Sequence, residues 1–344
     1  MGGVAARRRA GDFMSEQGVD LRAPGSDRRT LVVRAAGWSV LGFLAAFLIE
    51  NVLDVGFGIP VSRAIFSDGG AAATLPLAAY VICVGLVNFL VFRGPETTLR
   101  ADARRVHNFN VYLIRACFWS VLLIGIADVT IAFMRVEKLL ILFVDADMVR
   151  SLGLARFVGS YVHIPLVITG FVIAYFTRTL GFAWLALLIV LAELSIVVSR
   201  FVFSYEQALM GDLVRYWYAA LFLFASAYTL FDEGHVRVDV LYAGFGKRTR
   251  GFINAWGSIL LGMSTSWVIL AIGFNGHQSI INSPLMNFEI TQTGGVGMFI
   301  KYQMAAFLGI FAITMLIQFV SYLFESVADF RGEPGHVEHE TMVS

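Results

Sequence analysis

A cluster of ionisable residues around His235 offers the most chemistry in this sequence of 344 residues. His235 and Asp239 are four residues apart, so on a helix they would share one face and could hold a metal ion or relay a proton. The alternative is an interfacial helix, with Val236 and Val238 against lipid or protein. Arg237 and Asp239 would then make salt bridges or phosphate contacts. Because two candidate ligands do not make a metal site, we predict no metal, cofactor or catalytic residue here.

Other common catalytic motifs are missing from the sequence. It contains no glycine-rich phosphate loop, no nucleophile elbow and no zinc-type pattern of cysteine and histidine. Cys83 and Cys117 both lie in apolar runs and imply no disulfide. The glycines of 294–297 follow no predicted strand, so we interpret them as part of a flexible outer loop. We therefore expect a protein that is not an enzyme.

Several charged residues stand inside apolar runs that are long enough to cross a membrane. An unpaired charge at the middle of a bilayer costs several kcal/mol, so we expect each of these side chains to face protein or water. Glu193 and Arg200 are seven residues apart, about two helical turns, and could pair through a neighbouring helix or water. A solute pathway lined by such residues is the alternative interpretation.

The other charges in apolar runs lie closer to the ends of their runs. Arg115 and Asp128 would be about 20 Å apart along one helix axis, which favours an interfacial position for both. Glu50 and Asp54 are four residues apart near the outer end of another run, and we expect them to face water.

The composition indicates a membrane protein. Hydrophobic residues make up 58% of the chain and charged residues only 15%, whereas soluble domains average about 25% charged residues. The 30 phenylalanines exclude a disordered chain, and the net charge of +1 gives no basis for a nucleic-acid partner. Lipid leaves only helices and closed barrels able to satisfy their backbones, so we expect the apolar runs to be helices.

A spanning helix needs about 20 mostly apolar residues, and several runs approach this length. These runs are 33–53, 71–92, 109–133, 158–177, 180–199, 213–231, 252–274 and 302–324. They predict an all-α, polytopic transmembrane helix bundle of about eight spans, with seven or nine as alternatives. The segment 135–157 has an apolar stretch only at 139–144, so we expect it to lie along the outer membrane surface. The same is expected of 205–212 and 276–297.

The distribution of basic residues predicts the orientation. Lys and Arg prefer short cytoplasmic loops, and a cytoplasmic N-terminus puts roughly twice as many of them inside as outside. Both termini are therefore predicted to be cytoplasmic. Residues 1–30 contain no apolar core before a cleavage site and are predicted to be a disordered tail rather than a signal peptide. Residues 331–344 are predicted to be a second cytoplasmic tail.

The stretch 211–242 resembles the small membrane subunit, or DctQ component, of tripartite ATP-independent periplasmic (TRAP) transporters. That family carries an alanine-rich stretch followed by a His-[Ile/Val]-Arg-Val-Asp motif. The matching residues here are Ala225, Ala227, Tyr228, His235, Val236, Arg237, Val238 and Asp239. The family's first span often ends in an arginine followed by aromatic residues, similar to Arg200 and Phe201. The resemblance covers about 180–330 and implies a structural or interface role for the motif.

The resemblance also implies a location and partners. Such a subunit is a multi-pass protein of the bacterial inner membrane that scaffolds a large permease subunit of the DctM type. The large subunit carries the substrate and sodium sites, a periplasmic binding protein delivers an organic acid, and an ion gradient drives uptake. Membrane lipid is a further partner and nucleic acid is not. A stand-alone carrier or channel, or a membrane enzyme using His235 and Asp239, are the alternatives.

The resemblance divides the chain into four parts. They are a tail at 1–30, an N-terminal four-span extension at 31–178, a DctQ-like four-span domain at 179–330 and a tail at 331–344. The extension has no counterpart in a four-span member of the family, so the resemblance implies nothing about its role. A chain cut near Arg178 is expected to keep its partner contacts. Glu206 and Asp212 are the nearest equivalents of an acidic residue that family members often carry before the second span.

Overall fold

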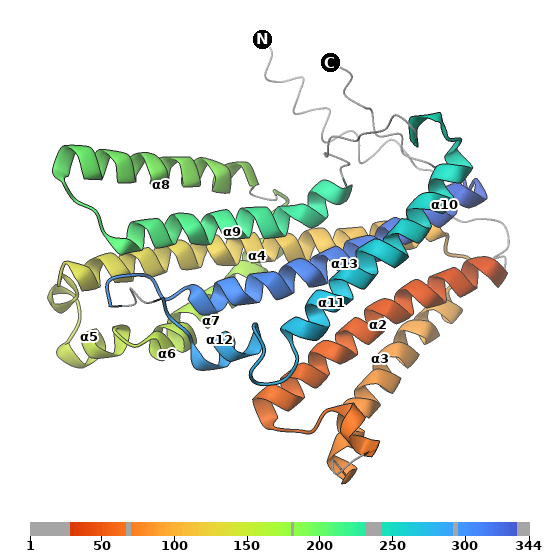
Figure 1. Ribbon diagram of the computed structural model, residues 1–344, viewed down its shortest axis with the longest axis horizontal. Coiled ribbons are helices and arrows are strands. Elements are labelled where there is room, and N and C mark those ends of the chain that lie inside the picture. The colour runs from red at the N-terminus through yellow and green to blue at the C-terminus, as the bar shows by residue number, and fades with distance from the viewer. Residues whose placement is uncertain (1–27, 67–69, 180–181, 232–241, 292–294, 336–344) are drawn as a thin grey trace.

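The computed structural model describes residues 28–66, 70–179, 182–231, 242–291 and 295–335. These residues fold almost entirely into helices (Figure 1). Eight helical segments are long and apolar enough to cross a membrane. The predicted all-α bundle with about eight spans is therefore confirmed.

The eight segments fall into two sets of four, before and after Arg178. The first set is α2 (Arg28–Phe57), η2 with α3 (Gly70–Ala73 and Thr74–Arg93), α4 (Leu99–Val136), and α6 with η4 and α7 (Ala155–Val158, Gly159–His163 and Ile164–Phe176). The second set is α8 (Phe182–Phe203), α9 (Ala208–Phe231), α10 with η6 and α11 (Lys247–Gly257, Ser258–Met263 and Ser264–Gly273), and α13 (Lys301–Arg331). The connections contain η1 (Ser62–Phe66), η3 (Leu140–Leu142), α5 (Ala146–Leu152), η5 (Tyr242–Gly244) and α12 (Asn282–Asn287).

The predicted interfacial segments have mixed outcomes. Between α4 and α6 the structure has only η3 and α5, with Ile141, Leu142 and Phe143 exposed, as an interfacial segment requires. In contrast, α9 already begins at Ala208, so most of 205–212 is the first turn of a span. The difference arises because Asp212, which makes this stretch polar in the sequence, is buried against protein.

The centre of the bundle is made by α4 and α13. Figure 1 shows both between the pair α8 and α9 at one edge and the pair α2 and α3 at the other. α4 packs on α7, α9 and α13, whereas α8 packs mainly on α9 and α3 mainly on α2. Small residues permit the close approaches: a Cβ at Gly125 of α4 would clash with the Trp217 indole of α9, and one at Gly170 of α7 would clash with Ser120.

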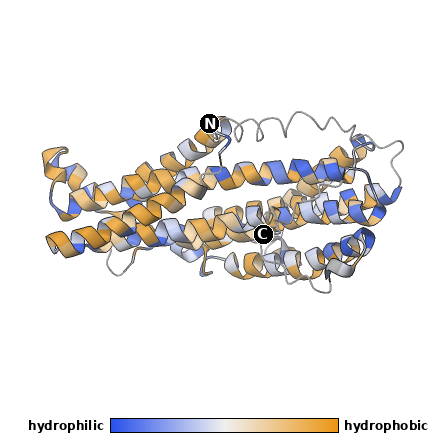
Figure 2. Ribbon diagram, turned by 90° about the horizontal axis from the view of Figure 1, so that it is seen from above, coloured by the Kyte–Doolittle hydropathy of each residue, from blue (hydrophilic) through white to orange (hydrophobic). Residues whose placement is uncertain are grey.

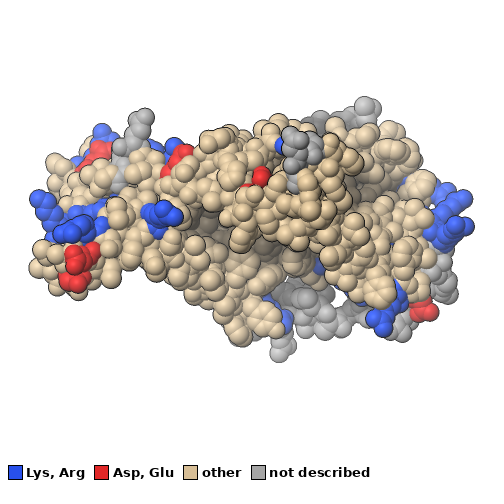
Figure 3. Space-filling view, turned by 90° about the horizontal axis from the view of Figure 1, so that it is seen from below, with Lys and Arg blue, Asp and Glu red and all other residues tan. Residues whose placement is uncertain are grey.

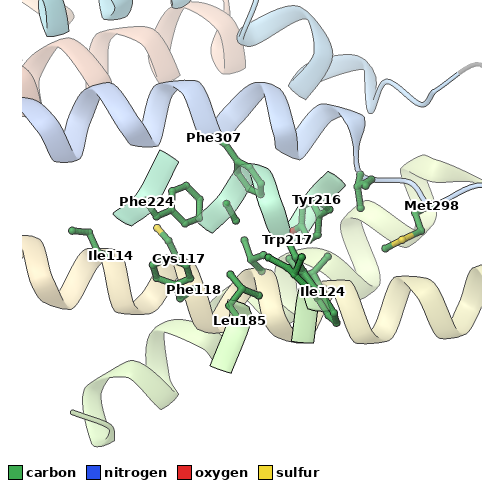
Figure 4. Close-up of a cluster of buried hydrophobic side chains, with 14 of the residues drawn as sticks. Ile114, Cys117, Phe118, Ile124, Leu185, Tyr216, Trp217, Phe224, Met298 and Phe307 are labelled. Atoms are coloured by element: carbon green, nitrogen blue, oxygen red, sulfur yellow. The ribbon is translucent and has the colours of Figure 1, made fainter. Parts of the chain in front are cut away.

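One hydrophobic cluster joins α4, α8, α9 and α13 (Figure 4). At its centre, Phe224 of α9 meets Phe118 of α4 and Phe307 of α13 edge to face, with ring centroids 5.6 Å and 4.9 Å away. This arrangement is the favoured geometry for aromatic pairs. A helix from before Arg178 therefore supplies part of the packing surface for helices that follow it.

A second hydrophobic cluster joins α2, α4, α11 and α13. Leu44, Val106 and Phe324 belong to it, and the Phe324 ring lies against the backbone of Gly37 in α2. Like the first cluster, it combines residues from both halves of the chain. The division into an extension and a DctQ-like domain stays a prediction, but the two regions share their interior.

The surface suits a membrane. Figure 3 shows most charged residues near the two ends of the long axis, with a broad uncharged region between them. Figure 2 shows apolar residues along the helices, and outward-facing ones such as Val81 and Val190 are 68% and 62% exposed. We name the two ends by residue. α2, α4 and α10 begin at the Arg100 end, and α9 and α13 begin at the Asp128 end.

Candidate functional site

The sequence motif at His235–Asp239 lies outside the described residues. The structure describes the chain on either side of it, up to Phe231 in α9 and from Tyr242 in η5. The Tyr242 hydroxyl donates to Asn254 Oδ1 at 3.0 Å, and the Arg250 guanidinium lies 5.3 Å from the centre of the Tyr242 ring. These contacts hold the chain that follows the motif against α10.

Two buried carboxylates hold a short backbone segment at the Asp128 end. The Asp212 carboxylate of α9 accepts a hydrogen bond from the Met298 N–H at 3.1 Å, and the Asp128 carboxylate of α4 accepts one from the Phe299 N–H at 2.7 Å. Asp128 is 1% exposed and Asp212 3% exposed. Hydrogen bonds to a charged acceptor contribute about 1.5–3 kcal/mol each. Together the two halves of the chain clamp residues 298 and 299 in front of α13.

Arg135 completes this clamp. Its guanidinium donates to the Gly297 carbonyl and lies 4.2 Å from the centre of the Phe299 ring. Met298, Phe299 and Ile300 are buried. The interpretation of 294–297 as a flexible loop is thus wrong at its end, because Gly297 is fixed and buried. Residues 292–294 lie outside the described part of the chain.

His163 adds a polar connection between α7 and α13. It ends the π-helical turn η4, and its Nε2 lies 3.4 Å from Asp128 Oδ1. Its Nδ1 lies 2.6 Å from the Tyr302 hydroxyl and 2.7 Å from Gln303 Nε2, while Gln303 Oε1 accepts from the Tyr216 hydroxyl. Nδ1 can therefore accept a hydrogen bond from the Tyr302 hydroxyl or from Gln303 Nε2, whereas Nε2 faces the Asp128 carboxylate at a longer distance without a hydrogen bond.

The side chains of this network hold helices and a loop in position and are not arranged as a catalytic site. Its members join α4, α7, α9 and α13, and each carboxylate faces a backbone N–H or a basic side chain. The described residues hold no group of three or more His, Cys, Asp and Glu side chains suited to a metal ion. Nothing in the sequence connected these residues, because their partners are between 86 and 171 positions apart.

At the Arg100 end, one arginine connects α4 to the end of α13. The Arg100 guanidinium pairs with Glu325 and, at 2.8 Å, with Asp329. It also donates to the carbonyls of Glu333 and Pro334 at 2.9 Å and 3.0 Å. Its side chain is 2% exposed. This is a complete set of partners for a buried guanidinium, and it fixes the relative position of the two central helices.

The same end ties α2 to α4. Arg34 Nε donates to the Asp102 carboxylate at 2.7 Å, and Trp38 Nε1 donates to the same oxygen at 3.0 Å. Closer to the middle of the bundle, His107 and Asn110 of α4 lie 3.1 Å and 3.3 Å from the Gln318 side-chain oxygen of α13. Polar contacts thus join the first third of α4, from Arg100 to Asn110, to the second half of α13.

Two predictions about isolated charges need correction. Asp128 was expected at the interface, but it is enclosed by protein because it caps backbone groups of a distant loop. Glu50 was expected to face water, but it is buried, with its carboxylate accepting from the Ser62 N–H and, at 2.6 Å, from the Tyr80 hydroxyl. Asp54 is half-exposed. In both corrected cases the partner comes from another element.

The structure gives Arg115 and Arg200 partners other than those considered from the sequence. Arg115 donates to the Thr177 carbonyl at 2.7 Å, which caps the end of α7. Arg200 Nε lies 3.4 Å from the Glu206 carboxylate rather than near Glu193. Glu193 is exposed and has no hydrogen bond or ion pair among the described residues.

The connection between α8 and α9 touches the end of α4. The Tyr205 hydroxyl donates to the Glu137 carboxylate, and this hydrogen bond raises the pKa of Tyr205 to about 12. The contact therefore persists to a pH above the ordinary tyrosine pKa of about 10.

The fold and these contacts define an integral membrane protein whose polar interior holds helices in place. Residues 186–327, from α8 into α13, match the family model described as "Tripartite ATP-independent periplasmic transporters, DctQ component". This part of the chain thus matches the DctQ component of TRAP transporters, a family of non-enzymatic membrane components, and an additional N-terminal helical region precedes it. Searches of curated proteins and of solved structures found no match.

Proposed function

We propose that this chain is the static small subunit of a TRAP transporter, bracing a large DctM-type permease subunit during ion-driven uptake of an organic acid. The match of residues 186–327 to the DctQ component carries the proposal. A periplasmic binding protein would deliver the substrate, and the bacterial inner membrane would hold the complex. The substrate pocket would lie in the partners, so this chain contributes packing rather than bond-making.

The fixed polar contacts support a static role. Arg100, Asp128 and Asp212 are buried, and each is bound by a partner from another helix or loop. Breaking a buried ion pair by removing one partner costs about 3–5 kcal/mol. A helix that slides or tilts during each transport cycle would have to release such contacts repeatedly. In contrast, a subunit that braces a moving partner is stabilised by such permanent contacts between its helices.

The proposal is tested by co-expressing the chain with its large permease subunit. A tag on this chain should recover the large subunit in a one-to-one ratio from mild detergent, because TRAP membrane subunits are expected to work as a pair. An unrelated eight-span protein carrying the same tag serves as the control. Recovery no better than this control would contradict the proposed role.

We further propose that both termini are cytoplasmic, which places the Arg100 end inside and the Asp128 end outside. The excess of Lys and Arg residues at the Arg100 end supports this orientation. In a chain with Cys83 and Cys117 replaced by alanine, a cysteine at Ala146 should react with an impermeant maleimide in intact cells. A cysteine at Gly246 should react only after lysis. Both positions are exposed, and the reverse pattern would contradict the orientation.

A further inference from the structure

α8 is the least covered span of the bundle. It packs mainly on α9, through a face that includes Leu185 and Ile189, and lies at the edge of the molecule (Figure 1). Most of its other large side chains are exposed, including Val190 and Val197 at 62% and 49%. α3, at the opposite edge, is similarly exposed. Of these two edge helices only α8 carries an acidic side chain, Glu193.

Glu193 lies in the middle of its span. It follows Phe182, the first residue of α8, by eleven positions, which is about 17 Å along the axis. The hydrocarbon core of a bilayer is about 30 Å thick. Glu193 is exposed, and in the described part of the chain no other Asp, Glu, Lys or Arg is exposed in the central third of a span. In an isolated chain this carboxylate would therefore face lipid.

Four hydroxyl side chains on the spans form hydrogen bonds within their own helices. The hydroxyls of Thr130, Thr169, Ser195 and Ser226 each donate to the carbonyl four residues earlier in their own helix, at 2.7–2.8 Å. An ionised carboxylate cannot do the same because it only accepts hydrogen bonds. Arg200, on the same flank of α8, is already paired with Glu206. To stay ionised in this position, Glu193 needs a hydrogen-bond donor or a cation, and the described residues supply neither.

The charge of Glu193 also indicates which kind of partner covers this flank. α3 carries no acidic or basic residue between Thr74 and Phe92, so lipid suits its exposed face. A two-fold contact between two copies of the chain at the Glu193 flank would bring two carboxylates together, which is unfavourable. A different protein with a basic or amide side chain at mid-membrane fits both the apolar surface and the charge.

We propose that the α8 flank formed by Val190, Glu193 and Val197 is the docking surface for the large permease subunit, which supplies a cationic or hydrogen-bond-donating side chain to Glu193. The proposal rests on the proposed function, since that function provides the partner. The two valines lie three residues before and four residues after Glu193, so the three side chains share one stripe of the helix. They would enclose the polar contact in an apolar rim.

The test uses the full chain co-expressed with the large permease subunit. Glu193→Lys should lower recovery of the large subunit at least roughly tenfold, because it opposes a donor with a cation. Ser195→Ala is the matched control: it lies two positions further along, on the opposite face of α8, and should recover the large subunit as the wild-type chain does. Gel filtration of each variant without the partner checks that it folds.

A second measurement decides the question without changing Glu193. A photoreactive amino acid at position 190 or 197 should cross-link to the large subunit, whereas one at position 81 of α3 should cross-link only to lipid. Cross-linking to a second copy of this chain, or equal cross-linking from positions 81 and 190, would overturn the assignment. So would wild-type recovery with Glu193→Lys. Failure of the wild-type chain itself to recover the large subunit would instead overturn the proposed function.

Discussion

A chain that starts at residue 179 should fail to accumulate as a folded membrane protein. The family resemblance alone suggested that the second half could stand by itself, but α4 supplies its central polar partners. Without α4, Gln318 loses its contacts with His107 and Asn110, and Glu325 loses Arg100. Exposed apolar surface costs little in lipid, whereas polar groups without partners cost several kcal/mol in total.

The truncation is measured by fluorescence-detected gel filtration of a green fluorescent fusion. The full chain should give a single symmetric peak, and the chain 179–344 should give aggregate or no signal. Co-expression of residues 1–178 as a separate chain is the control and should restore the peak, because the contacts between the halves are non-covalent. A monodisperse 179–344 chain that recovers the large subunit would show that the N-terminal region is dispensable.

Replacing Arg100 by methionine should be the most damaging single substitution at the Arg100 end. It keeps the apolar stem but removes the cation that lies between Glu325 and Asp329, at a cost of about 3 kcal/mol. Arg105→Met is the matched control, because Arg105 is exposed on the same helix and its 3.4 Å pair with Asp102 contributes at most about 1 kcal/mol.

The difference is measured as thermal stability in detergent. Arg100→Met should lower the melting temperature by several degrees more than Arg105→Met. Equal melting temperatures would show that the ion pairs at this end do not hold α4 to α13. A Glu325→Gln, Asp329→Asn double variant should recover part of the loss in Arg100→Met, since it removes the two carboxylates that faced the Arg100 guanidinium.

The sequence predicts the spans well because twenty apolar residues suffice to define one. It underestimates α4, expected at 109–133 but observed from Leu99 to Val136. The first turns of α4 contain Arg100 and Asp102, which count against a span when they are taken alone. In the structure their partners come from α13 and α2. Hydropathy cannot register such pairings, because it assigns each residue a value that ignores its neighbours in space.

The contacts of the site were beyond prediction for the same reason. Asp128 and Asp212 stand 84 positions apart in the sequence, yet they hold consecutive backbone N–H groups of a loop that follows both. His163 carries no sequence signal at all, since a single histidine in an apolar run has many possible roles. The sequence shows that Glu193 places a charge inside a span, which costs free energy in a membrane. Only the structure shows that the described residues give it no partner.

The central claim is that this chain supports transport without performing it, and uptake by reconstituted vesicles tests that most directly. With a sodium gradient and radiolabelled organic acids, vesicles that contain this chain alone should accumulate none above protein-free vesicles. Accumulation should appear when the large permease subunit is present in the membrane and the periplasmic binding protein is added outside. Sodium-driven uptake by this chain alone would contradict the account and make it a carrier in its own right.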